Sequence, residues 1–133
     1  MTIEEGLYSY LSTFAGIVAL ISDKIYPISI PQSVELPAIA YTKIAADRPR
    51  SAIGGHSGLT LTTFQISVFS ETKTEESAVT EQIHTALLNY KGLMGAVDVQ
   101  GCFCLSEING YDIDKEGTNT KEYYNHIDYQ ITT

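Results

Sequence analysis

The chain is poor in positive charge, cysteine and long apolar segments, and it has no tryptophan. Sixteen acidic residues outnumber eight lysines and arginines, which gives a formal net charge of −8. Nonspecific nucleic-acid binding depends on neutralising phosphates with Lys and Arg, so this composition argues against it. No apolar run approaches the ~20 residues of a membrane-spanning helix, and the first residues lack the basic charge of a secretory signal. We therefore expect a cytoplasmic protein with no membrane contact.

The only two cysteines are Cys102 and Cys104. In a strand, residues two apart point to the same face and are poorly placed for an unstrained disulfide. No second Cys or Cys/His group supplies the other half of a zinc site. The pair is therefore predicted to be free, structural thiols.

Proline is also scarce, and three of the four prolines fall within residues 24–41, at Pro27, Pro31 and Pro37. Each proline fixes φ and removes a backbone donor, so the segment cannot be a helix or the middle of a sheet. It is predicted to be an extended arm that crosses the surface and leads into a strand at Ala38.

Apolar periodicity predicts the order helix, strand, strand, helix, strand, strand. The expected helices cover residues 2–21 and 74–90, and the expected strands cover residues 38–45, 59–70, 97–108 and 122–132. This order favours one domain over residues 1–133, of the α+β class, with an antiparallel sheet of about four strands and two main helices packed on one face. Residues 46–58 are predicted to be a long glycine-containing loop, and Asn109–Gly110 a turn.

Alternation along the strands predicts which side chains face the core. In the last strand one phase contains Tyr123, Ile127, Tyr129 and Ile131, and the other contains Tyr124, His126, Asp128 and Gln130. In the strand before it, Val97, Val99, Phe103 and Leu105 are expected on one face. Residues 59–70 change phase after Leu61, which indicates a bulge or two different packing partners.

No set of residues predicts catalysis. The histidines at 56, 84 and 126 have no metal-ligand spacing, and Ser57 precedes a strand rather than the helix that a nucleophile elbow requires. Asp112, Asp114 and Glu116 alternate as in a calcium loop, but position 123 carries tyrosine where that loop needs a bidentate glutamate. A small-ligand or divalent-metal-binding module, using these acids or the cysteine pair, is the alternative function. No cofactor is predicted.

Several short motifs, in a fixed order, carry a resemblance that spans nearly the whole chain. They are DKIYP at 23–27, PQ at 31–32, LPAIAY at 36–41, GL at 58–59, FQISVFS at 64–70 and HIDYQI at 126–131. In this order they resemble the tail-completion, or tail-to-head joining, proteins of long-tailed bacteriophages, which are often found in prophages.

The resemblance implies a virion structural protein, not an enzyme: an α+β subunit that caps the tail tube and helps join it to the head connector. Related tail terminators form hexameric rings. The implied partners are further copies of the chain, the head connector, tail-tube proteins and DNA passing through the channel. The implied location is the tail or neck of the virion, and the bacterial host cytoplasm during assembly.

The family supplies no contact residues, so these are inferred from the arm and the loop. The candidate assembly contacts are Pro27, Pro31, Gln32, Pro37, Arg48, Arg50, Gly54, Gly55 and His56.

Overall fold

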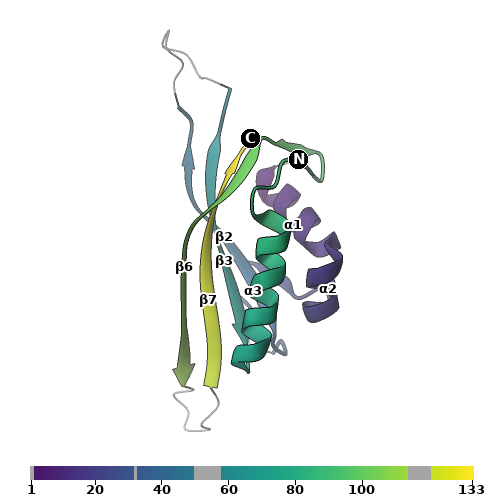
Figure 1. Cartoon of the computed structure of the whole chain (residues 1–133), viewed down its shortest axis with the longest axis vertical. Coiled ribbons are helices and arrows are strands. Elements are labelled where there is room, and N and C mark those ends of the chain that lie inside the picture. The colour runs from purple at the N-terminus through teal and green to yellow at the C-terminus, as the bar shows by residue number, and fades with distance from the viewer. Residues whose placement is uncertain (1, 32, 50–57, 114–120) are drawn as a thin grey trace.

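The computed structural model describes residues 2–31, 33–49, 58–113 and 121–133, and it has two layers, a sheet and a set of helices on one of its faces (Figure 1). The helices are α1 (Ile3–Thr13), α2 (Ala15–Ile21) and α3 (Lys73–Leu87). The strands are β1 (Ile25–Pro27), β2 (Ala38–Asp47), β3 (Leu61–Ser70), β4 (Gly92–Met94), β5 (Val97–Val99), β6 (Gly101–Ile113) and β7 (Lys121–Thr132). None of the helices in those ranges is long and apolar enough to cross a membrane.

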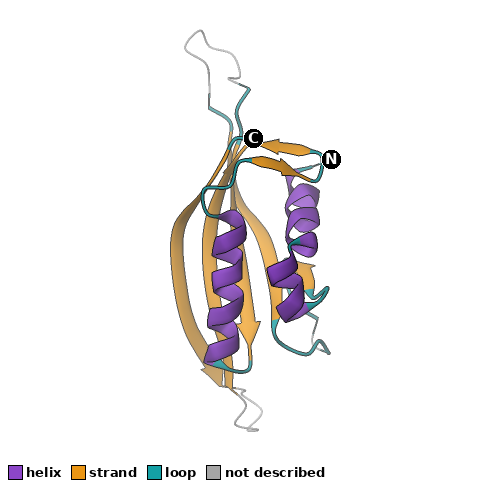
Figure 2. Cartoon of the chain, turned by 45° about the vertical axis from the view of Figure 1, so that its right-hand side comes forward, coloured by secondary structure: helices purple, strands orange, loops and turns teal. Residues whose placement is uncertain are grey.

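The main sheet has five strands in the order β1-β2-β3-β7-β6, and it is mixed because β1 runs parallel to β2 while the other pairs are antiparallel. The prediction of an antiparallel sheet of about four strands was therefore wrong in detail, although the α+β class is confirmed. The strand that was not predicted is β1, in the proline-rich arm. It lies at the edge of the sheet, so the backbone N–H that Pro27 lacks is not required for pairing with another strand of the described sheet. A separate hairpin, β4–β5, lies at one end of the molecule beside the N-terminus (Figure 2).

The first predicted helix is divided in two, so the structure has three helices and not two. Thr2 caps α1, since its Oγ1 accepts a hydrogen bond from the Glu5 backbone N–H at 3.2 Å. The break between α1 and α2 falls at Phe14, whose backbone is extended, and Gly16 lies inside α2.

Helix α3 begins and ends slightly earlier than predicted. Thr72 caps it by accepting a hydrogen bond from the backbone N–H of Glu75 at 3.2 Å. The helix ends at Leu87, and Asn89 adopts the left-handed conformation (φ 59°) that usually follows a helix C-terminus.

The core lies between the sheet and the three helices. Its largest fully buried side chains are Leu7, Leu11, Ile17, Ile21, Ile39, Phe64, Ile66, Ile83, Leu87, Met94, Ile127 and Tyr129. The predicted alternation in the last strand is confirmed in β7, where Ile127, Tyr129 and Ile131 face the helices. The three helices of the described residues all lie on one side of the sheet (Figure 1), and we call the opposite sheet face the open face.

Strand β6 departs most from prediction. Asn109–Gly110 is not a turn but lies inside β6, where Gly110 is opposite Tyr124 of β7. A Cβ at Gly110 would lie 2.6 Å from the Tyr124 hydroxyl, so the glycine makes room for that ring rather than for a chain reversal. Phe103 and Leu105 do not share the core face with Val99, because both are about half exposed.

The expected bulge in β3 is found in its neighbour instead. The pairing of β2 with β3 skips Ile44, and the pairing of β6 with β7 skips Leu105. Each skipped residue lies on a strand at or near a sheet edge, where bulges are common.

Candidate functional site

The structure describes four of the nine candidate assembly contacts predicted from sequence. These are Pro27, Pro31, Pro37 and Arg48. The other five, Gln32, Arg50, Gly54, Gly55 and His56, lie outside the described residues, so their part in assembly stays a prediction.

The four described contacts do not form one site. Pro27 ends β1 opposite Tyr41 of β2, and Arg48 follows β2 seven residues further along the chain. At about 3.3 Å per strand residue, the two positions are roughly 20 Å apart. Arg48 is exposed where β2 and β3 project beyond the helix layer (Figure 1), and Pro37 follows a cis peptide bond in the arm. The proline-rich arm and the projecting end of the β2–β3 pair therefore present separate surfaces.

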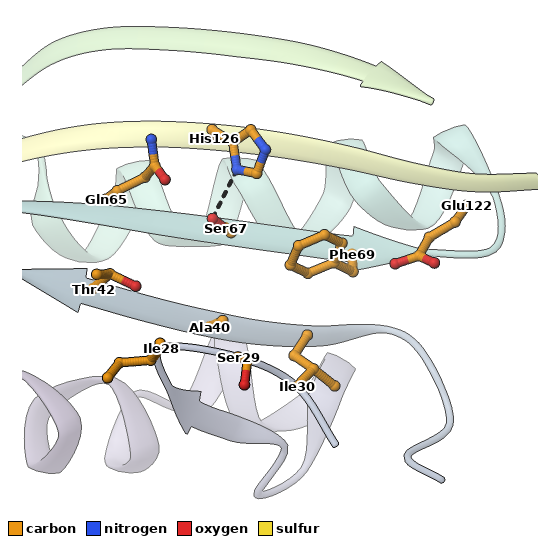
Figure 3. A pocket seen from close by; sticks show the side chains of 10 residues that line it. All are labelled: Ile28, Ser29, Ile30, Ala40, Thr42, Gln65, Ser67, Phe69, Glu122 and His126. Carbon is orange, nitrogen blue, oxygen red and sulfur yellow. Dashed lines mark hydrogen bonds between the residues drawn. The ribbon is translucent and has the colours of Figure 1, made fainter. Parts of the chain in front are cut away.

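A groove of about 360 Å³ lies on the open face, between the sheet and the chain that follows β1 (Figure 3). Its lining residues are Ile28, Ser29, Ile30, Ala40, Thr42, Gln65, Ser67, Phe69, Glu122 and His126. The groove is mixed in character, because four of these residues, Ile28, Ile30, Ala40 and Phe69, are apolar and the other six are polar or charged.

The polar groups in the groove are paired across β3 and β7. Oγ of Ser67 and Nδ1 of His126 are 2.8 Å apart, and the rings of Phe69 and Tyr124, which are register partners of each other, lie near the imidazole with ring centroids at 6.1 and 4.9 Å. Ser67 and His126 are register partners of β3 and β7, so we interpret the pair as part of the sheet surface.

A second hollow of about 300 Å³, on the helix side of the sheet, lies between α3 and the strands β6 and β7. We call it the acidic slot, because it is lined by Lys73, Glu76, Ser77, Thr80, Glu81, His84, Glu107, Asn109 and Asn125.

Hydrogen bonds connect most of the acidic slot. Oγ1 of Thr80 donates to the buried carboxylate of Glu76 at 3.0 Å. Nδ2 of Asn125 donates to Thr80 Oγ1 at 3.0 Å and to Glu107 Oε1 at 2.7 Å. The Asn125 amide oxygen, which is buried, has no partner within the described part of the chain. A buried polar group normally has one, so this position is suited to an ordered water.

His84 links the slot to the core. Its Nδ1 is hydrogen-bonded to the hydroxyl of Tyr129, and its Nε2 lies 3.2 Å from Glu107 Oε2. The pKa of Glu107 is lowered, chiefly by the hydrogen bond from Asn125 and also by His84, while partial burial opposes the change. Burial raises the pKa of Tyr129, so that phenol stays protonated and remains a hydrogen-bond donor.

The described residues include both cysteines but not all of the acids that were considered as metal ligands. Cys102 and Cys104 are free thiols, as predicted. Burial, and then the neighbouring thiol, raises the pKa of Cys102 to about 12, which leaves it a poor metal ligand at neutral pH. Within the described ranges, no three His, Cys, Asp or Glu side chains are grouped to hold a metal ion. Asp114 and Glu116 lie outside those ranges, so the metal-binding alternative stays a prediction.

The outer strand β6 is a functional candidate that the sequence analysis missed. Phe103, Leu105 and Ile108 on this strand are 51%, 54% and 66% exposed. Exposed apolar side chains along an edge strand are typical of a surface that pairs with another chain. The sequence does contain a signal for this surface, because the apolar residues change from odd to even positions between 105 and 108. The bulge at Leu105 explains that change. The sequence analysis instead assigned the strand a single buried face.

Two comparisons with known proteins agree with this structure. The family model described as "Tail completion protein gp17" matches residues 5–119. A chain from a structure titled "Virion of native gene transfer agent (GTA) particle" has the same fold, with a TM-score of 0.71 and 14% sequence identity over 95% of this chain and 90% of that one. A search of curated proteins finds no match. Because the family model covers most of its length, the chain belongs to the tail completion protein gp17 family of phage tail structural proteins.

Proposed function

We propose that this protein is a ring-forming subunit at the junction of a phage head and tail, where it caps the tail tube and joins it to the head connector. One observation carries the proposal: the chain belongs to a tail completion family and has a sheet whose open face and outer strand lack a covering layer in the described residues. The fold it shares with a chain of a gene transfer agent virion is consistent with a place in a particle of this kind. On this proposal the protein works in the virion neck after assembly in the bacterial cytoplasm, and a prophage is the expected genomic setting.

A structural role accounts for the surfaces better than a catalytic one. The polar groups of the acidic slot are mostly bonded to one another, and Ser67 and His126 pair across two neighbouring strands of the sheet. On this proposal the protein acts by fitting against other components, without making or breaking bonds.

The projecting hairpin between β2 and β3 is proposed to contact a component beyond the ring. Arg48 is exposed there, in a chain of strongly negative net charge, so its loop suits an acidic partner or the DNA in the channel. Acidic surfaces elsewhere would let DNA pass without adhering.

Deletion of the gene tests the proposed role. Electron microscopy of induced lysates should then show separate filled heads and separate tails, and a copy of the gene supplied in trans should restore joined particles. Normal joined particles from the deletion strain would refute the proposal.

Charge reversal tests the hairpin by itself. The double change Arg48→Glu and Arg50→Glu should reduce the yield of joined particles, whereas the matched reversal Lys91→Glu, outside the hairpin, should leave that yield unchanged. Equal yields from both variants would remove the hairpin from the proposal and leave the rest in place.

A further inference from the structure

The main sheet has two edges formed by different strands, and β6 forms one of them. This strand is the last in the sheet order, so its outer side has no neighbouring strand in the part of the chain that the structure describes. Phe103 and Ile108 pair with Gln130 and His126 of β7 and share the open face with them. The outer backbone of β6 and these two apolar side chains are therefore available together on one edge.

The opposite edge is formed by β1 and the second half of β2. Strand β1 pairs only with residues 39–41 of β2, so within the described chain the outer side of β2 has no strand beside it beyond Tyr41. Ile44 on that stretch is 50% exposed and Ile28, just after β1, is 75% exposed. Half of the large apolar side chains that the described residues expose lie on these two edges.

Ile28 has a backbone conformation that supports a role for this edge. Its φ is +69°, a region that β-branched residues rarely occupy because Cβ crowds the backbone. Strained conformations of this kind cluster at functional sites. Here the conformation sets an isoleucine at the mouth of the groove on the open face, with most of its surface exposed (Figure 3).

Strand pairing fixes which residues of the two edges lie at the same level. One row of register partners runs from Ile108 through His126 and Ser67 to Ala40, and Ala40 lines the groove. Subunits in a closed ring are related by rotation without translation. When the strands run along the ring axis, Ile108 of one copy is therefore level with the groove of the next.

A second row adds an apolar contact on the same face. It runs from Phe103 through Gln130 and Thr63 to Ala45, which is adjacent to the exposed Ile44. A continued sheet would thus place Phe103 level with Ala45 of the next copy, the residue after the exposed Ile44.

On the helix side of the sheet, the same arrangement brings opposite charges near each other. Glu107 is level with Tyr41, two residues before Lys43 on β2, and both charged side chains face the helix layer. Residues two positions apart on neighbouring strands are within reach of long side chains. Complementary charge in this position favours the correct partner and register.

From these relationships we propose that β6 of one copy pairs antiparallel with the β1–β2 edge of the next copy, with Ile108 entering the groove on the open face. The direction follows from the topology, because β6 runs antiparallel to β7 and β7 runs parallel to β2. Such a contact joins two different surfaces head to tail, and this type of contact gives a ring when the rotation between successive copies closes. The inference rests on the proposed ring function and assigns its interface.

Cross-linking of particles assembled in cells tests the assignment. A variant with Ile108→Cys and Ser29→Cys, in a Cys104→Ser background, is treated with a short bismaleimide and separated by mass. The expected result is a ladder of dimer, trimer and larger species that ends at one closed form. Ile108→Cys alone, Ser29→Cys alone, and Ile108→Cys combined with Ala19→Cys on α2 should give no product beyond a dimer.

The outcomes separate this inference from the proposed function. Absence of the ladder in joined particles would overturn the interface, while the deletion phenotype tests the function independently. A cross-link from Ile108→Cys alone to a protein of different mass, without a ladder, would assign β6 to another component and would also overturn it. A second variant, Phe103→Asp with Ile108→Asp, should keep the wild-type melting temperature, because both residues are exposed, yet should lose the joined particles. Normal joining by that variant would likewise refute the interface.

Discussion

Asn125 on β7 and Thr80 on α3 are joined by a 3.0 Å hydrogen bond from the side-chain amide to the hydroxyl, and both side chains are buried. The same amide also holds Glu107, and Thr80 in turn donates to the buried carboxylate of Glu76. This chain of bonds is one of the polar connections between the helix layer and the sheet, beside those that His84 makes, so its integrity affects how α3 packs on β7.

Replacement of Asn125 by alanine should lower the free energy of unfolding by about 2 kcal/mol. The change removes the donor for two oxygens and leaves them poorly satisfied, and loss of one partner of a buried hydrogen bond costs about 1–3 kcal/mol. Urea denaturation followed by circular dichroism gives the value. Asn109→Ala is the matched control: Asn109 is opposite Asn125 on the exposed strand β6 and should change stability by less than about 0.5 kcal/mol. Equal effects of the two changes would contradict the role given to the buried amide.

Glu107 should make stability depend on pH in the acidic range. Its folded pKa is below the ordinary value of 4.5, so the folded state binds this proton less readily than the unfolded state. The stability it contributes is therefore complete above about pH 4.5 and is lost as the pH falls through the folded pKa. Glu107→Gln keeps an oxygen for Asn125 but cannot ionise, and it should flatten this part of the curve.

Melting temperatures measured across that range test the prediction. Glu71→Gln, an exposed residue next to the N-terminus of α3, is the control and should leave the shape of the acid limb unchanged. A Glu107→Gln variant whose acid limb matches that of the wild type would show that this carboxylate is not the source.

Long periodic elements were predictable because a single buried face dominates them. The stripe of Val79, Ile83 and Leu87 predicted α3, and alternation through Ile127, Tyr129 and Ile131 predicted β7. In each case burial against one partner layer fixes the spacing of the apolar residues, so the local sequence is sufficient to predict the element.

The remaining features depend on contacts that local pattern does not contain. Strand β1 is three residues long, too short to show alternation, and it exists because β2 lies beside it. Asn109–Gly110 has the composition of a turn, yet Tyr124 covers the glycine and the strand continues. The apolar residues of β6 were assigned to the core, because a sequence cannot distinguish a face that packs inside one subunit from a face that packs between two.

Two helix glycines should respond in opposite directions to alanine. A Cβ at Gly6 of α1 would lie 2.7 Å from the carbonyl oxygen of Met94, a backbone atom of β4 that cannot move without shifting the hairpin. Gly6→Ala should therefore destabilise the protein by about 1–3 kcal/mol, as overpacking does. A Cβ at Gly16 would meet the far end of the flexible Gln82 side chain, and it would lie 3.3 Å from the Phe14 ring. Gly16→Ala should be neutral or stabilising by up to about 1 kcal/mol, since alanine is the better helix former.

Chemical denaturation of the two glycine variants beside the wild type measures both effects. The prediction fails if Gly6→Ala is as stable as the wild type, which would mean that α1 does not approach the β4–β5 hairpin as closely as described.

The cysteines provide a test of how tightly β6 is held against the core. Burial raises the pKa of Cys102 to about 12 from an ordinary value of 9.0, so its reactive thiolate should be about a thousand times rarer at neutral pH than in the unfolded chain. The pKa of Cys104 is also raised, first by partial burial and then by the nearby carboxylates Glu107 and Asp128.

Labelling with a chromogenic disulfide reagent should thus be slow in the native protein and should reach both thiols quickly in guanidinium chloride. In a Cys104→Ser variant, the remaining thiol reports on Cys102 alone, and its native labelling rate gives the frequency with which β6 opens. Fast native labelling of that variant would show that the strand detaches readily from β7, which is incompatible with a rigid edge that docks against a neighbouring copy.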